Sequence, residues 1–313
     1  MDIKHILKLL GDQQVPGDEV TSGFLADALS NFAADPAGSR SVIRQLQAKD
    51  SSGFALAAVR LLVTSEEKSP GLQYIAGLIT AGAVLLDPLL DERLLPLDVA
   101  VPLARKVTVA EPLLDVHLVR KMMENVKGDV NAISTTKALH GLGLVGAISD
   151  CSRLTFQLVQ FARHPSAHVR SKAVLLLGRA NWNLNRIKGY LEANDDRVRA
   201  NAIESSWHHD TPEVLDILWK ATNDRSNRVV VNALLGLCQA GDREAYARVY
   251  KLAGAPGAGL RSGAAWAMGE IGDMEFEETL EKLEKDGDAK VRAMAEKSRK
   301  KLRLSLASVP QLT

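Results

Sequence analysis

The chain has 313 residues, of which 46% are hydrophobic and only 4% aromatic, and its formal net charge is +1. Few aromatic residues beside many alanines, leucines and valines favour packed helices over a strand-built sandwich, so we expect an all-α fold. The small net charge argues against nucleic-acid binding through bulk charge, because phosphate neutralisation normally leaves a strong excess of lysine and arginine.

The amino-terminal third carries only a weak helical pattern. Its first residues, MDIKHILKLLGDQQ, form a short charged amphipathic run and lack the unbroken apolar stretch of a secretory signal. We expect an irregular helical cap over residues 1–50 and degenerate helical repeats over residues 51–111. Four prolines are predicted to cut the leucine-rich part of this segment into short pieces, because proline interrupts helices: Pro88, Pro96, Pro102 and Pro112.

The most apolar stretch lies within these degenerate repeats, at residues 72–86. It falls short of the roughly 20 residues that a membrane-spanning helix needs. Gly77, Thr80 and Gly82 also interrupt its apolar face. We therefore predict a buried helix here and no membrane association.

Six alanines recur through the rest of the chain at intervals of 29 to 35 residues: Ala138, Ala173, Ala202, Ala233, Ala264 and Ala295. An aliphatic residue, here called the register residue, precedes each of the last five by four positions: Val169, Val198, Val229, Leu260 and Val291. Positions four apart share one helix face, so each alanine belongs to the buried stripe of a helix. This period predicts stacked helix pairs over residues 112–304, followed by a tail at 305–313.

A helix-start residue stands three positions before each register residue: Ser166, Asp195, Ser226, Gly257 and Asp288. Serine, aspartate and glycine are preferred where a helix begins, since a side-chain oxygen can accept an unpaired backbone N–H. Aliphatic residues eleven positions before the register residues supply the stripe of a preceding helix. Each alanine therefore marks the second helix of a pair.

The segments VRSKAVLLLG at 169–178, VRANAIESSW at 198–207 and LRSGAAWAMGEIGD at 260–273 resemble HEAT repeats, particularly the short HEAT-like repeats of the phycobilisome-lyase type. The resemblance implies a right-handed α-α superhelix, a solenoid of stacked antiparallel helix pairs, which mostly serves as a scaffold. In such repeats an arginine after the register residue forms a ladder with turn aspartates. Here that resemblance points to Arg170, Arg199, Arg261 and Arg292, with Val230 breaking the series, and to aspartates such as Asp195 and Asp288.

The sequence offers no recognisable active-site motif. HEAT-like di-iron hydroxylases carry His-Glu pairs, whereas no histidine in this chain is followed directly by glutamate. Cys151 and Cys238 form neither a CxxC zinc pair nor a disulfide framework, which favours a reducing cytoplasm. We expect no enzymatic activity, no cofactor and no metal.

Two groups of residues that include aromatic side chains are alternative candidate sites. A metal or acid–base role for residues 207–210 would need a further ligand, for which Cys238 and Glu204 are the candidates by register. HEAT-like DNA glycosylases use an aromatic-lined channel, but Trp182 and Trp219 are assigned to first helices. Trp207 and Trp266 are assigned to second helices, so the four should not line one groove.

The face of each second helix opposite its buried stripe is predicted to line the concave side of the array. A step of about 100° per residue places offsets of 2, 6, 9 and 10 from the register residue on that face. Apolar residues beside charges there are typical of a protein-binding groove, unless neighbouring helices cover them. The predicted partner-binding residues are His140, Leu175, Arg179, Glu204, Trp207, His208, Leu235, Gln239, Trp266 and Glu270.

The leading hypothesis is a non-enzymatic HEAT-repeat scaffold or adaptor that binds a protein or peptide along this face. One alternative is nucleic-acid binding along a basic stripe of Lys172, Arg179, Arg199, Arg261 and Arg292. Another, a lyase-like chromophore-handling protein, is implied by the family resemblance alone. The oligomeric state and the identity of the partner stay open.

Overall fold

The computed structural model describes residues 18–49, 53–54, 57–58, 61, 69–81, 86–93, 95–108, 112–124, 126–180 and 182–307. Every regular element in these ranges is a helix, which confirms the all-α fold. The chain divides into two compact units, Met1–Phe161 and Ala162–Thr313. The amphipathic run at residues 1–14 lies outside the described residues.

The first unit contains helix pairs of unequal length. Its helices are α2 (Asp18–Ser30), α3 (Pro36–Lys49), α5 (Pro70–Ala81), α6 (Leu86–Leu90), α7 (Leu97–Thr108), α8 (Leu114–Glu124), α9 (Thr135–Ile148) and α10 (Thr155–Phe161), with 3-10 turns η1 (Val130–Ala132) and η2 (Ser152–Leu154). Helix α2 packs on α3, and α9 packs on both α7 and α8. None of the helices in the described ranges is long and apolar enough to cross a membrane.

The prediction that all four prolines would divide the leucine-rich segment was wrong at Pro102. Helix α7 runs through this residue. The proline is exposed, whereas Leu103, Ala104 and Val107 on the other side of α7 are buried. The ring therefore costs one backbone hydrogen bond without disturbing the packed face. Pro96 and Pro112 do lie just before α7 and α8, where proline is tolerated.

The second unit is a solenoid of regular helix pairs. Its helices are α11 (Ala167–Ala180), α12 (Leu184–Leu191), α13 (Asp196–Glu204), α14 (Pro212–Ala221), α15 (Asn227–Gln239), α16 (Arg243–Ala253), α17 (Ala258–Ile271), α18 (Glu277–Leu283) and α19 (Ala289–Ala307), with a 3-10 turn η3 (Met274–Phe276). Helices α12, α14, α16 and α18 each pack against the helix that follows, and α11, α13, α15, α17 and α19 pack side by side in that order.

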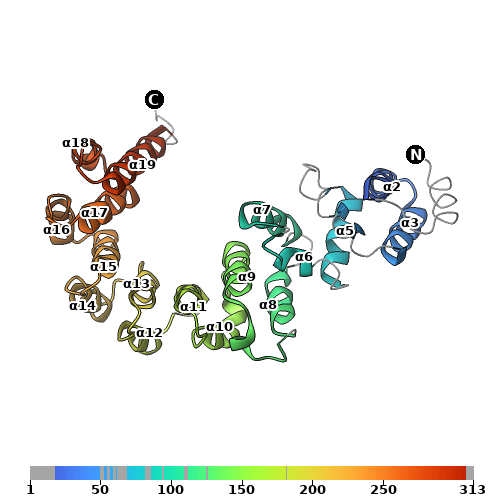
Figure 1. The fold of residues 1–313 in the computed structure, drawn as a ribbon, viewed down its shortest axis with the longest axis horizontal. Coiled ribbons are helices and arrows are strands. Elements are labelled where there is room, and N and C mark those ends of the chain that lie inside the picture. The colour runs from blue at the N-terminus through green and yellow to red at the C-terminus, as the bar shows by residue number, and fades with distance from the viewer. Residues whose placement is uncertain are drawn as a thin grey trace. The chain divides into compact units, whose positions relative to one another are not determined.

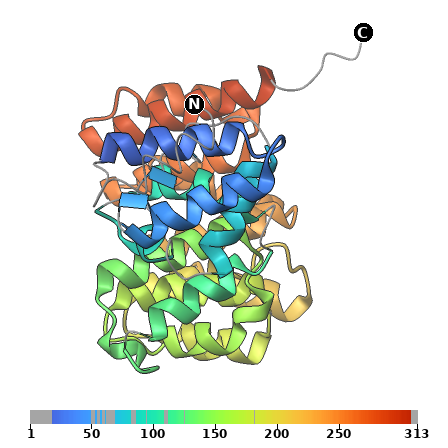
Figure 2. The ribbon, with the colours of Figure 1, turned by 90° about the vertical axis from the view of Figure 1, so that its right-hand side faces the viewer.

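Within this unit, the second helices lie on the inner side of an arc and the first helices on its outer side (Figure 1). Figure 1 views most of these helices nearly along their axes, whereas Figure 2 shows the same yellow to red helices side-on, as layers. The inner surface of this unit is therefore built almost entirely from second helices.

The repeat alanines and the helix starts lie where the sequence predicts them. All six alanines have an exposed fraction of 0%. Helices α11, α13, α15, α17 and α19 each begin at the residue after the predicted start residue. The Asp195 carboxylate accepts from the Arg197 N–H, and the Asp288 carboxylate accepts from the N–H groups of Lys290 and Val291. Start signals and buried stripe together fix the register of every second helix in the unit.

Neighbouring second helices approach so closely that several contact positions have no room for a larger side chain. A Cβ added to Gly178 would lie 2.1 Å from the Ser205 Cβ, and one added to Gly269 would lie 2.6 Å from the Ser298 Cβ. Asn201 adds a direct tie, because its side-chain amide donates to the Ser171 carbonyl of the preceding second helix at 2.8 Å. Small residues and buried amides thus set the spacing of the repeats.

The ladder arginines act within the scaffold. The Arg199 guanidinium donates to both carboxylate oxygens of Asp224, at 2.9 and 2.8 Å, and also to the carbonyls of Ala193 and Asn194. Arg261 repeats the arrangement with Asp286, at 2.7 and 2.9 Å. Each pair joins a second helix to the turn that precedes the next one.

The aspartate partners differ from those that the family resemblance suggested. Asp224 and Asp286 lie five residues before a register residue, whereas Asp195 and Asp288 cap helices. At the other two junctions the same position is Ala193 or Ala255, and Val230 replaces the arginine that would meet Ala255. Bidentate pairs therefore occupy alternate junctions of the described array.

We expect Ala233→Leu to lower the free energy of unfolding by about 1–3 kcal/mol, because the site is fully buried between closely packed helices and overpacking forces them apart. Urea denaturation of the full chain measures this change. Ala240→Leu is the matched control, since Ala240 is exposed at the end of the same helix. Equal effects of the two substitutions would contradict the close-approach explanation.

The ladder pair should also give the stability a defined dependence on pH. Donation from Arg261, aided by the Asp288 N–H, lowers the pKa of Asp286 to about 2. A depressed carboxyl pKa stabilises the fold above the unfolded-state pKa, and this contribution is lost as the pH falls toward the folded-state value. Asp286→Asn should therefore lower the unfolding free energy at pH 7, and its difference from the wild type should shrink between about pH 4 and pH 2.

Asp216→Asn is the comparison for this experiment. Asp216 pairs with Lys220, but both side chains are largely exposed, and exposed pairs contribute little. A difference between Asp286→Asn and the wild type that stays constant across the acid range would refute the role assigned to the ladder carboxylate.

Candidate functional site

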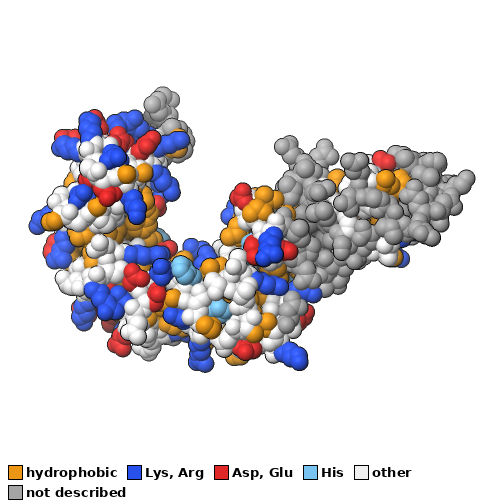
Figure 3. Space-filling model, viewed as in Figure 1, with side chains coloured by type: hydrophobic (Ala, Val, Ile, Leu, Met, Phe, Trp, Pro, Cys, Tyr) orange, Lys and Arg blue, Asp and Glu red, His pale blue; other side chains and the backbone are white. Residues whose placement is uncertain are grey.

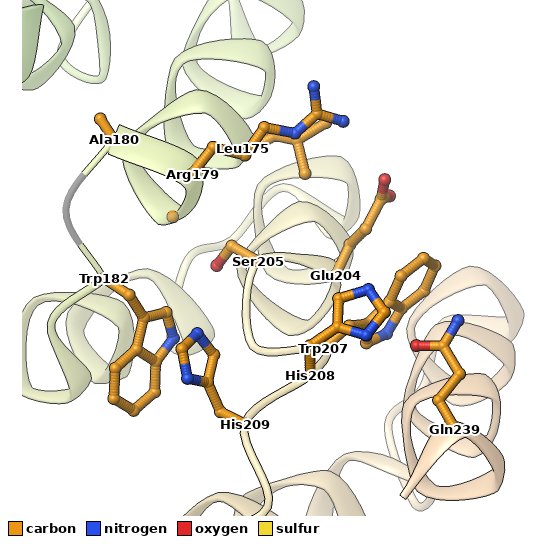
Figure 4. A pocket seen from close by; sticks show the side chains of 11 residues that line it. Leu175, Arg179, Ala180, Trp182, Glu204, Ser205, Trp207, His208, His209 and Gln239 are labelled. Carbon is orange, nitrogen blue, oxygen red and sulfur yellow. The ribbon is translucent and has the colours of Figure 1, made fainter. Parts of the chain in front are cut away.

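A pocket with a volume of about 590 Å³ opens in the second unit where α13 ends early. Helix α13 has 9 residues, whereas its neighbours α11 and α15 have 14 and 13. The lining residues come from the ends of α11, α13 and α15 and from the connections after α11 and α13 (Figure 4): Leu175, Gly178, Arg179, Ala180, Trp182, Glu204, Ser205, Trp207, His208, His209 and Gln239.

Two serine hydroxyls explain why α13 stops at Glu204. The Ser205 and Ser206 hydroxyls both donate to the Ala202 carbonyl, at 2.7 and 3.1 Å. The backbone N–H of Ser206 bonds instead to the Ile203 carbonyl, three residues back. Side chains that compete for a helix carbonyl favour this tightening and end the helix. The chain then turns away and leaves the hollow.

The structure brings six of the ten predicted partner-binding residues into this one pocket: Leu175, Arg179, Glu204, Trp207, His208 and Gln239. They occupy offsets 6, 9 and 10 of successive second helices. Figure 4 shows Arg179 and Glu204 extending on one side, with the rings of Trp207 and His208 below them.

Two predicted residues, His140 and Leu235, are buried, so their assignment to an exposed face was wrong. His140 belongs to the first unit, where its Nε2–H donates to the Leu89 carbonyl at 2.8 Å. Leu235 lies on α15 with an exposed fraction of 0%. Helix α15 packs between α13 and α17, and the indoles of Trp207 and Trp266 lie with their ring centroids 6.5 Å apart.

The remaining two predicted residues lie farther along the inner face. Trp266 on α17 is half-buried beside Trp207. Glu270 is exposed and forms an ion pair with Lys301 of α19. Offsets 2 and 9 are also mostly buried, because they face the adjacent second helix: Val231 meets Gly263, for example. Offsets 6 and 10 reach the inner surface, together with Trp207 at offset 9.

Trp182 and His209 line the pocket and were not predicted to do so. Their rings stack at a centroid distance of 4.0 Å and an interplanar angle of 19° (Figure 4). Trp182 was assigned to a first helix, but it lies in the connection before α12. The signal for this was Asn183, whose side chain accepts from the Arg186 N–H and so caps α12. Trp182 and Trp207 therefore do line one site.

Trp207 is held firmly by α15. Its indole Nε1–H donates to the Asn232 carbonyl at 2.9 Å. Gly236 leaves space for the ring, since a Cβ there would lie 2.7 Å from the Trp207 Cδ1. The ring is thus a rigid wall of the pocket.

His208 adopts a left-handed backbone conformation with φ of 67°. Residues other than glycine rarely adopt this conformation, because their Cβ crowds the following carbonyl. The histidine side chain is exposed at the pocket, where glycine would be easier to accommodate. A strained residue retained at a pocket is an indication of function.

Burial is the largest cause of the pKa shifts of Glu204 and His209 in the pocket. Burial raises the pKa of Glu204, and positive charges on Arg228, Arg179 and Lys172 act against it. Burial lowers the pKa of His209. The site thus combines a poorly solvated carboxylate with aromatic rings.

The pocket does not assemble the ligand set that was considered for a metal. Burial raises the pKa of Cys238 to about 12, which keeps the thiol protonated at neutral pH. Across the ranges that the structure describes, no three histidine, cysteine or acidic side chains are placed to hold a metal ion.

The basic stripe of the nucleic-acid hypothesis is not a continuous free surface. Arg199 is buried and Arg261 is paired, as described above. Arg292 donates to the carbonyls of Asp286 and Gly287. Over α17–α19, Figure 3 shows positive and negative side chains interspersed. These arginines organise turns, which explains their repeat spacing without a nucleic acid.

Stacked helix pairs with a register alanine, a turn-binding arginine and an inner second-helix face define a helical-repeat solenoid. The sequence model for HEAT repeats matches residues 156–234 and 221–299. Over these residues the chain belongs to the HEAT-repeat family. The match does not single out the phycobilisome-lyase type.

The chain was also compared with curated protein sequences and with solved structures. No curated protein sequence matches the chain. A solved structure of human deoxyhypusine hydroxylase in complex with glycerol is similar over 91% of this chain and 98% of that chain, with 14% identity and a TM-score of 0.34. That likeness does not transfer the enzyme's activity to this chain.

We expect His208→Gly to raise the free energy of unfolding by up to about 1 kcal/mol. Removing the Cβ relieves about 1–2 kcal/mol of backbone strain. The greater conformational freedom of glycine in the unfolded chain offsets part of this gain in stability. His209→Gly is the control, because it loses the stacked ring without relieving a left-handed backbone. Urea denaturation should show opposite signs for the two variants, and a loss of stability in both would contradict the strain at His208.

Proposed function

We propose that this HEAT-repeat protein is a non-enzymatic scaffold that binds a protein segment along the inner second-helix face of its second unit. The pocket at the end of α13 is the centre of this surface. The observation that carries the proposal is the meeting of two tryptophans with charges of both signs at one hollow. Partly buried aromatic anchors inside a polar rim are typical of binding sites for protein segments.

Two polar side chains at the pocket are available to an extended peptide. Gln239 and Arg179 are exposed, and within the described part of the chain neither forms a hydrogen bond that would have to break. Backbone carbonyls and amides of a bound segment would pair with these side chains, whereas an empty pocket leaves them to solvent.

The chemistry of the pocket favours binding over catalysis. The Ser205 hydroxyl lines the pocket and donates to the Ala202 carbonyl at 2.7 Å. Nucleophilic catalysis requires a nucleophile within hydrogen-bond reach of a base that can deprotonate it. Among the described residues, no base is hydrogen-bonded to the Ser205 hydroxyl.

Trp182→Ala tests the proposed surface. The probe is a set of short peptides selected from a random phage-displayed library on the full chain, with affinities then measured by fluorescence anisotropy. Loss of a half-buried indole at the centre of an interface should weaken binding by about tenfold or more. Circular dichroism and thermal unfolding establish that the variant is folded.

Trp219→Ala is the matched control. Trp219 is also half-buried in the second unit, but it lies on the outer helix α14, where it donates to Asp242 and lies under Arg248. Its loss should leave the peptide affinity unchanged. Equal affinities of Trp182→Ala and the wild type would remove the pocket from the binding surface.

A further inference from the structure

Glu204 is the most deeply placed charge in the pocket. It is the last residue of α13, and its carboxylate extends into the hollow beside Leu175 and Arg179 (Figure 4). Its contact with a hydrogen-bond donor is long, 3.5 Å from Oε2 to the Asn232 side-chain nitrogen. Within the described residues Glu204 forms no ion pair. The carboxylate is therefore partly shielded from water and has no close partner among these residues.

The positively charged side chains near Glu204 lie close enough to influence its pKa, but among the described residues none forms an ion pair with it. Burial outweighs the combined influence of Arg228, Arg179 and Lys172, so that the pKa of Glu204 is raised despite three positive neighbours. Arg228 is exposed and donates to the Asn201 side chain at 3.1 Å. A buried carboxylate gains most from a cation that reaches it directly and donates hydrogen bonds to it.

The rings beside Glu204 suit a cationic group. In Figure 4 the rings of Trp207 and His208 lie below the Glu204 side chain, whose carboxylate extends away from them into the same pocket. Positive groups are attracted to the face of an aromatic ring, most strongly to that of tryptophan, and more so where water is excluded. Long basic side chains also bury an apolar stem, for which Leu175 and Trp207 provide a surface.

We propose that the pocket receives a basic side chain, arginine or lysine, from the bound protein segment, with its N–H groups donating to the Glu204 carboxylate and its stem along Trp207. This inference rests on the proposed function and names the residue type that the site selects. Arg179 lies at the rim and acts as a competing cation, which must move aside as the ligand enters.

The main alternative is that the pocket selects an acidic side chain instead of a basic one. An acidic segment could pair with Arg179, which is exposed and uncommitted among the described residues. However, water screens an exposed guanidinium, whereas Glu204 is half-buried, and poorly screened charges dominate selectivity. The Glu204 carboxylate therefore determines the sign of the charge that the pocket prefers, and Arg179 at the rim modulates the affinity.

Two charge-neutralising variants separate these possibilities because they should act in opposite directions. With peptides selected as above on the wild-type full chain, Glu204→Gln should weaken binding by about tenfold to a hundredfold, since a charge-assisted hydrogen bond is lost. Arg179→Gln should tighten binding by about twofold to fivefold, because repulsion from a partly screened like charge disappears. The selected peptides should share a basic residue.

Glu213→Gln on α14 and Arg243→Gln on α16 are the matched controls, since both side chains are exposed on first helices. They make the same changes of net charge away from the pocket and should leave the affinity unchanged. Thermal unfolding of all four variants checks that each is folded.

The outcomes distinguish this inference from the proposed function. Peptides that share acidic residues and lose affinity in Arg179→Gln would overturn the inference while leaving the scaffold function intact. Selected peptides whose affinity is indifferent to Glu204→Gln would also overturn it. Failure to select any peptide on the folded chain would overturn both.

Discussion

The close lateral approach of neighbouring second helices is the constraint on which the second unit depends. Where a Gly178 Cβ would lie 2.1 Å from the Ser205 Cβ, no larger residue fits without moving a whole repeat. The completely buried alanines impose the same limit within each pair. A helix pair in such an array buries its apolar side only against its neighbours, so spacing and stability are set together.

The same constraint determines which side chains of the second helices are exposed on the inner surface. Offsets 2 and 9 are mostly taken up by contacts between second helices, so recognition falls to offsets 6 and 10 and to the half-buried Trp207 at offset 9. A regular array would present these as a shallow strip. The two serine hydroxyls that end α13 early convert part of the strip into a pocket. Recognition here depends on a local exception to the repeat.

Much of the scaffold could be predicted from the sequence because its signals are local. The alanine period, the start residues and the aliphatic stripe each depend on contacts within one helix pair or one turn. Exposure was predicted less well, because it depends on residues far away in sequence. Leu235 occupies an offset that should be exposed, but it is completely buried on α15, which packs between α13 and α17. Trp182 was missed because a single cap, Asn183, shifts the start of α12 beyond it.

The ladder ion pairs occupy alternate junctions between second helices, and the pocket lies at a junction that lacks such a pair. Bidentate arginine–aspartate pairs tie α13 to the turn before α15 and α17 to the turn before α19. At the junction of α11 and α13 the aspartate position is Ala193, so this junction is held by packing and by the bond from Asn201 to Ser171. The pocket spans that same junction, with Arg179 on α11 and Glu204 on α13. A segment bound there would contact both helices and so add a tie at a junction that has no ladder ion pair. Binding and the coupling of adjacent repeats are therefore expected to reinforce each other, because any ligand that favours the assembled junction stabilises it.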